Sequence, residues 1–92
     1  MKKIVLEEIE YELVKNYKDA FNLEEVKELY TDYFKDYDYI VGDIAYNKLR
    51  LKGFYDAKNK KVKSFNNFKS VDVYLNEFCS YDCKHFIIKK IA

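Results

Sequence analysis

The stretch that decides the fold runs from residue 37 to residue 55 and reads YDYIVGDIAYNKLRLKGFY. It is rich in β-branched and aromatic residues, which fit a pleated and half-buried surface. It therefore predicts two strands, at about 37–45 and 49–55, joined by a tight turn at Asn47-Lys48.

The segments on either side of this stretch predict further strands and two helices. Residues 9–15, IEYELVK, alternate with a period of two, which is typical of a half-buried strand. Asn22 is expected to cap a helix whose apolar stripe runs through LEEVKELYTDYF, and Ser70 is expected to cap a second helix, SVDVYLNEF. The last strand is KHFIIKKI, and short extra strands are considered at 3–6 and 61–65.

The predicted order of elements is β-α-β-β-α-β, which indicates an α+β fold in a single domain over residues 1–92. In the ferredoxin-like arrangement, four antiparallel strands take the order 4-1-3-2 and both helices cover one face. A strand at 3–6 would add an edge to this sheet. The other sheet face is then expected to be open.

Strand 49–55 carries the candidate binding face. Leu49 and Leu51 should face the helices, which places Arg50, Lys52 and Phe54 on the open side. Lys52-Gly53-Phe54 matches the start of the RNA-recognition signature, whose aromatic residues stack on bases. Asp56 stands where the second aromatic is needed, so a base-stacking platform is disfavoured. An ordinary solvated face remains the alternative.

Charge is divided unevenly along the chain, although the net charge is only +1. Residues 1–45 carry 6 Lys and 12 Asp or Glu, whereas residues 46–92 carry 11 Lys or Arg and 4 Asp or Glu. The basic half contains a run of lysines that could attract an anionic partner. These candidate binding residues are Lys58, Lys60, Lys61 and Lys63.

The cysteines raise a separate possibility. Cys79 and Cys83 are four residues apart and precede His85, the only histidine. They are read as buried structural thiols, as a reversible redox pair or as metal ligands. Only three soft ligands exist in the chain, so no metal and no cofactor are assigned. One histidine and no Gly-rich phosphate loop favour a protein that is not an enzyme.

No run approaches the roughly 18 apolar residues of a membrane span, and the N-terminal apolar run is too short for a signal peptide. A cytoplasmic protein without a membrane partner is therefore expected.

Four strings resemble the YutD-like family of small proteins from low-GC Gram-positive bacteria and their relatives. They are YDYIVGD (37–43), LRLKGFYD (49–56), YLNEFCSYDC (74–83) and FIIKK (86–90). The resemblance covers nearly the whole chain from Tyr11 onward. It departs at residues 44–48, where the family has WGYGQ and this chain has IAYNK. The resemblance implies no established reaction, but it includes Asp43 among the positions that could share the family's role.

The leading hypothesis is a non-enzymatic binding or adaptor module that docks an RNA-containing or acidic protein partner. Docking would use Arg50, Lys52, Phe54 and the lysine run. One alternative is a thiol-based redox or metal-binding role of Cys79 and Cys83. The other is a structural homodimer formed through the open sheet face.

Overall fold

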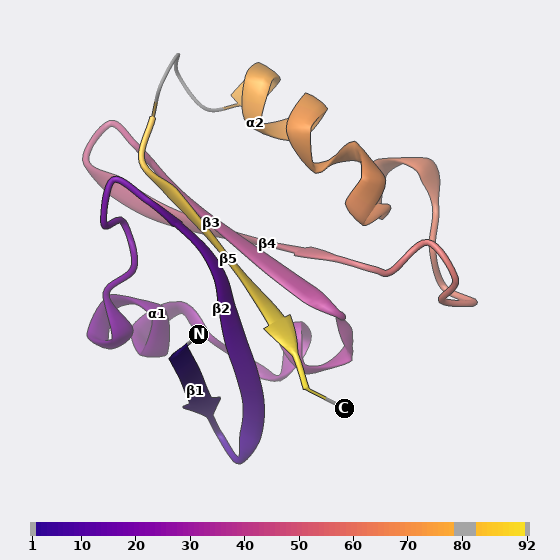
Figure 1. Ribbon diagram of the computed structural model, residues 1–92, viewed down its shortest axis with the longest axis horizontal. Helices are drawn as coiled ribbons and strands as arrows, with labels where there is room; N and C mark the ends of the chain where they lie inside the picture. The colour runs from indigo at the N-terminus through magenta and orange to yellow at the C-terminus, as the bar shows by residue number, and fades with distance from the viewer. Residues whose placement is uncertain (1, 79–82, 92) are drawn as a thin grey trace.

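The computed structural model describes residues 2–78 and 83–91 (Figure 1). Within these residues the chain forms two α-helices, three short 3-10 helices and one five-stranded sheet. In chain order the elements are β1 (Lys2–Leu6), β2 (Ile9–Tyr17), α1 (Leu23–Leu29), η1 (Asp32–Asp36), β3 (Tyr39–Ala45), β4 (Lys48–Phe54), η2 (Ser64–Asn66), η3 (Phe68–Ser70), α2 (Val71–Phe78) and β5 (His85–Lys90). None of the described helices is long and apolar enough to cross a membrane.

The strands lie in the order β1-β2-β5-β3-β4, and every neighbouring pair is antiparallel. The α+β class is confirmed, and the extra N-terminal strand is present at one edge. The ferredoxin-like order is wrong, because β5 lies between β2 and β3 instead of at an edge.

The central place of β5 agrees with its apolar sequence. Phe86, Ile87 and Ile88 are all buried, with exposed fractions of 0%, 6% and 0%. Consecutive residues of a strand point to opposite faces, so such a run is buried only where both faces of the sheet are covered.

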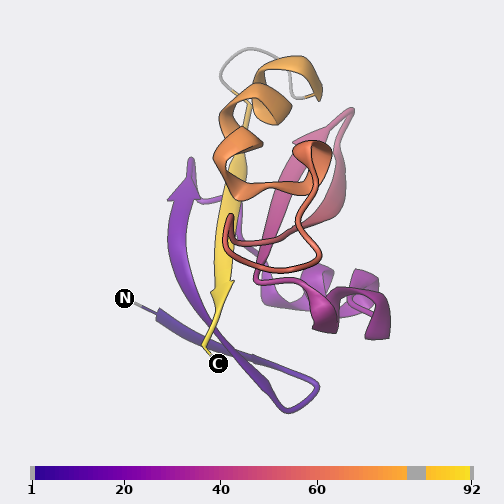
Figure 2. The ribbon, with the colours of Figure 1, turned by 90° about the vertical axis from the view of Figure 1, so that its right-hand side faces the viewer.

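The two helices cover opposite faces of the sheet. Val26 of α1 packs in the same cluster as Ile40, whereas Val71 of α2 packs in the same cluster as Val41. Ile40 and Val41 are consecutive residues of β3 and point to opposite sides. The expectation that both helices share one face is therefore wrong, and the helices lie well apart in both views (Figures 1 and 2).

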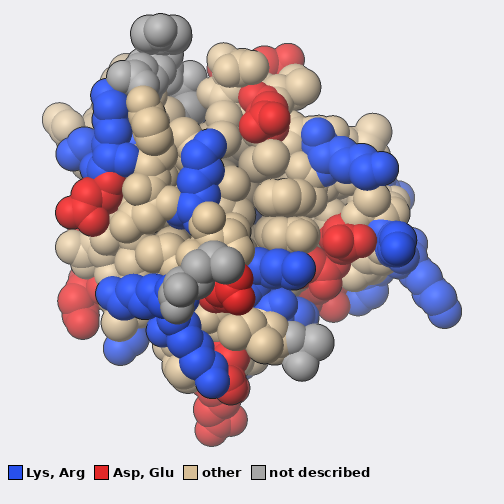
Figure 3. All heavy atoms as spheres, in the orientation of Figure 1, with Lys and Arg blue, Asp and Glu red and all other residues tan. Residues whose placement is uncertain are grey.

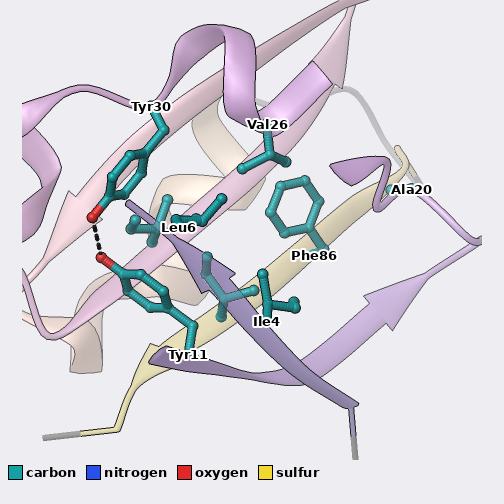
Figure 4. Close-up of a cluster of buried hydrophobic side chains, with 9 residues drawn as sticks. Ile4, Leu6, Tyr11, Ala20, Val26, Tyr30 and Phe86 are labelled. Carbon is teal, nitrogen blue, oxygen red and sulfur yellow. Dashed lines mark hydrogen bonds between the residues drawn. The ribbon is translucent and has the colours of Figure 1, made fainter. Parts of the chain in front are cut away.

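The larger cluster, which we call the α1-side core, joins α1 to β1, β2, β3 and β5 (Figure 4). The ring of Phe86 meets Phe21 edge-on at 5.1 Å between centroids. The hydroxyls of Tyr11 and Tyr30 are hydrogen-bonded at 2.8 Å inside the cluster. Burial raises the pKa of Tyr11, and the hydrogen bond to Tyr30 raises it further.

Both glycines of the chain lie under aromatic rings of the α1 side. A Cβ on Gly42 would lie 2.1 Å from the Phe86 ring, and one on Gly53 would lie 2.3 Å from the Tyr37 ring. The absence of a side chain at these two positions lets each ring lie directly against the strand.

The turns are built without glycine. The β3–β4 hairpin turns at Tyr46 and Asn47, with φ of 54° and 63°, so the turn lies one residue earlier than Asn47-Lys48. Glu7 and Glu8 turn the β1–β2 hairpin in the same way, with φ of 46° and 73°.

The helix ends are only partly as predicted. The side chain of Asn22 accepts from the Glu25 N–H at 3.2 Å, which confirms the cap of α1. α1 nevertheless ends at Leu29, Tyr30 and Thr31 are extended, and η1 then covers Asp32–Asp36. The strand considered at 61–65 is not formed, because η2 begins at Ser64. The Ser70 hydroxyl donates to the Ser64 carbonyl at 3.2 Å instead of capping α2.

Candidate functional site

The predicted binding face of β4 is the face that α2 covers. Arg50, Lys52 and Phe54 do share one side of β4, opposite Asp43, Val41 and Tyr39 of β3. Phe54, however, is fully buried and meets the Tyr74 ring of α2 edge-on at 5.6 Å. The prediction of an outward-facing aromatic residue at position 54 is wrong, so Phe54 cannot stack on a base without displacing α2.

Arg50 is neutralised within the protein. Its guanidinium donates to Oδ2 of Asp43, its cross-strand neighbour, and this hydrogen bond raises the pKa of Arg50. The Asp43 side chain is completely buried, whereas 42% of the Arg50 side chain is exposed. A buried carboxylate needs such a cation, so the two residues that were predicted as separate contacts form one structural pair.

This pair belongs to a polar row across the sheet. Tyr17, His85, Asp43 and Arg50 are successive cross-strand neighbours on β2, β5, β3 and β4. The Tyr17 and His85 rings lie 5.0 Å apart. Sequence reasoning missed this row, because pairing between β5 and β3 cannot be read from local patterns.

His85 is fixed in one orientation within the row. Its Nδ1 lies 3.0 Å from the Cys83 carbonyl, and because a carbonyl can only accept, Nδ1 carries the proton. Within the described part of the chain, the buried atoms Nε2 of His85 and Oδ1 of Asp43 have no hydrogen-bond partner.

Beside the row, a groove of about 590 Å³ lies between β4, η2 and α2. We call it the α2 groove, and its walls are Lys52, Ser64, Phe65, Ser70, Val73, Tyr74 and Glu77. Phe65 and Val73 are 66% and 56% exposed, and both line this one opening. Burial raises the pKa of Tyr74, and the charge of Asp43 adds to the rise.

Lys52 forms part of the groove wall and is half-buried. Its ammonium lies 5.3 Å from the Phe54 ring centroid and 5.6 Å from that of Tyr74. Two rings therefore hold one cation at a defined place beside an apolar opening.

The lysine segment, residues 58–63, is tied to the body of the protein by acidic side chains. Lys61 donates to both oxygens of Asp36, at 2.9 and 2.7 Å, and the Tyr55 hydroxyl donates to Asp36 Oδ2 at 2.7 Å. These bonds lower the pKa of Asp36, and burial and Asp36 together raise that of Tyr55 to about 12. Asp38 accepts from Asn59 Nδ2 at 3.0 Å.

The remaining predicted cations of this segment project into solvent. Lys58, Lys60 and Lys63 are exposed, and basic side chains protrude at the right-hand edge of the molecule over this part of the chain (Figure 3). The structure does not bring them together with Arg50, which lies at the opposite end of β4. Their binding role stays a prediction.

The cysteine pair is not tested. Cys79 lies outside the described residues, so its pairing with Cys83 as a redox couple or as metal ligands stays a prediction. Among the residues that the structure describes, no three histidine, cysteine or acidic side chains are grouped as a metal would require.

Sequence and structure comparisons give this chain close relatives. The family described as "Putative antitoxin YutD-like" matches residues 5–89. A Bacillus subtilis (strain 168) protein named "Putative antitoxin YutD" is 44% identical over 88 residues, which make up 96% of this chain and 97% of that protein. The solution NMR structure of protein yutD from B. subtilis has a TM-score of 0.83 and 43% identity, covering 99% of this chain and 83% of that one. The likeness extends over both sequence and fold.

Proposed function

The chain belongs to the YutD-like family, and we propose that it is a non-enzymatic protein that acts by binding another protein through the α2 groove. The word antitoxin in the names of its relatives supports a protein partner. We propose the same kind of role for this chain: it would bind a partner protein and inhibit it, and would not transform a substrate.

The observation that carries the proposal is the pair of exposed apolar side chains on the groove. Phe65 and Val73 come from different elements, η2 and α2, and line the same opening. Exposed apolar side chains that are grouped and rimmed by polar residues are typical of protein interaction surfaces. Isolated exposed residues elsewhere carry no such meaning.

A protein partner fits this surface better than RNA does. Phe54 is buried and Arg50 is paired with Asp43, so the cation–aromatic face that an RNA partner required is not available. The homodimer hypothesis assumed an open sheet face. In the structure, α1 packs on one face of the sheet and α2 on the other.

Two matched variants test the proposal. Val73 in the groove and Val5 on the edge strand β1 are 56% and 53% exposed, and each is changed to glutamine. Tagged full-length chains are used to capture partners from the organism that encodes the protein, with and without nuclease. We expect one protein to co-purify in stoichiometric amount with the wild type and with Val5→Gln, and to be lost with Val73→Gln.

Three results contradict the proposal. The captured protein could be retained by Val73→Gln, the capture could depend on intact RNA, or no protein could be retained by the wild type. Amide spectra of both variants must match that of the wild type, so that a loss of capture reports on the groove and not on unfolding.

A further inference from the structure

Lys52 differs from the other half-buried cations. Lys35 donates to Asp32, and Lys90 donates to the Lys35 carbonyl, both at 2.8 Å. Arg50, which is exposed, is paired with Asp43. Within residues 2–78 and 83–91, the Lys52 ammonium has two aromatic rings beside it and no carboxylate within 4.0 Å. A partly desolvated cation with no anionic partner favours the arrival of a carboxylate.

The charges around the groove point the same way. Lys63 precedes the wall residue Ser64, Lys69 precedes the wall residue Ser70, and both lysines are exposed. Neither forms an ion pair within the described residues. Two exposed carboxylates stand against these three lysines: Glu77 on the groove wall and Asp72, which precedes the wall residue Val73. The cations outnumber the carboxylates by one, and only Lys52 among them lies on the groove wall beside aromatic rings, which favours an acidic group at that place.

The apolar side chains of the groove indicate a second feature that a bound segment must have, beside its negative charge. Phe65 and Val73 line the same opening as Lys52 and leave more than half of their surface in water. Covering them requires a bulky apolar side chain near the carboxylate. An acidic nucleic-acid backbone supplies phosphates but no aliphatic side chain at this spacing.

We propose that the α2 groove binds a segment of a partner protein in which an acidic residue adjoins a bulky apolar residue. The carboxylate contacts Lys52, and the apolar side chain packs between Phe65 and Val73. This inference rests on the proposed function and names the chemistry of the partner.

Capped synthetic pentapeptides test this chemistry without knowledge of the partner. The probes are Gly-Leu-Glu-Phe-Gly, its amide counterpart Gly-Leu-Gln-Phe-Gly, and Gly-Ser-Glu-Ser-Gly, which lacks apolar side chains. Each is titrated into the ¹⁵N-labelled full-length protein, and amide shifts are followed. We expect the first peptide to bind with a millimolar Kd and to shift the amides of the groove wall. The glutamine peptide should bind about fivefold more weakly, and the serine peptide should cause no shift.

Lys52→Met and Lys48→Met form the matched pair of variants. Methionine keeps an unbranched apolar stem at either position of β4 and removes the charge. Lys52→Met should abolish the difference between the glutamate and glutamine peptides, whereas Lys48→Met should leave it unchanged. Equal affinity of these two peptides for the wild type, shifts centred away from the groove, or no binding of any peptide would overturn the inference, even if a variant failed to fold.

Partner capture distinguishes a failure of the proposed function from a failure of the inference about an acidic segment. If a partner is lost with Val73→Gln but is retained by Lys52→Met at unchanged affinity, the proposed function stands and the inference about an acidic segment is wrong. If Val73→Gln retains the partner, the proposed function itself has failed. Loss with both variants, together with weaker capture at high salt, supports both.

Discussion

The two sides of the sheet are built for different tasks. The α1 side is closed by α1 and the β1–β2 hairpin. Among the buried residues described in its core cluster, Tyr11 and Tyr30 form the one side-chain hydrogen bond. The α2 side has a smaller apolar cluster, a charged pair and a groove that leaves Phe65 and Val73 in water. The difference indicates that one side supplies most of the stability and the other side carries the interaction surface.

Replacing one phenylalanine on each side should give the largest contrast. Phe86→Ala removes a fully buried ring from the α1-side core and should cost about 3–5 kcal/mol of unfolding free energy. Phe65→Ala removes an exposed ring of the groove and should change stability by less than about 0.5 kcal/mol. Urea denaturation measures both. Comparable losses would show that the α2 groove is part of the stabilising core.

The two glycines test how closely the aromatic rings of the α1 side pack against the strands. Gly42→Ala pushes a methyl group against the buried Phe86 ring and should cost about 1–3 kcal/mol. Gly53→Ala should cost less, because the Tyr37 ring is only half-buried and can move. Combining Gly42→Ala with Phe86→Leu should recover part of the loss, which a double-mutant cycle would detect. Strict additivity would rule out the ring contact as the cause.

A smaller effect is expected at the buried pair of tyrosine hydroxyls. Tyr11→Phe removes this hydrogen bond and should cost about 0.5–1.5 kcal/mol of unfolding free energy. Tyr33 and Tyr37 form a hydrogen bond of the same length, 2.8 Å, at an exposed position, so Tyr33→Phe is the control and should be nearly neutral. Thermal unfolding of the two variants compares them. Equal losses of stability in the two variants would mean that burial does not determine how much each hydrogen bond contributes.

The smallest effect concerns the lysine segment and depends on pH. Bonding to Lys61 and Tyr55 lowers the pKa of Asp36 below its ordinary value of 3.8. A lowered pKa contributes stability above the unfolded value, and that stability is lost as the pH falls through the folded value. Asp36→Asn should therefore cost up to about 1 kcal/mol at pH 7, because the pair is exposed. The difference from the wild type should disappear in acid well below pH 3.8. A difference that persists there would exclude the ion pair as its origin.

Local sequence patterns predicted much of the fold. The alternation in residues 9–15, the cap at Asn22 and the hairpin after Tyr39 all appear in the structure. The order of strands did not, because it depends on contacts between distant segments. One signal pointed to the true arrangement. The unbroken apolar run Phe86-Ile87-Ile88 is typical of a strand covered on both faces, which an open-faced sheet cannot provide.

The candidate site was predicted less well for the same reason. Strand parity correctly grouped Arg50, Lys52 and Phe54, but parity does not say which element covers a face. The position of α2 over that face buried Phe54 and created the groove beside Lys52. Phe65 and Val73 carried no signal in the sequence, because apolar residues in a loop and a helix are usually buried.

The central strand also sets the order of events during synthesis. β1 with β2, and β3 with β4, can pair as soon as each hairpin emerges, since both are local in sequence. The inner edges of β2 and β3 have to wait for β5, the last of the described strands to be made. Until then each hairpin is only marginally stable and presents unpaired backbone groups. The two hairpins therefore become one sheet only when β5, which pairs with both, inserts between them.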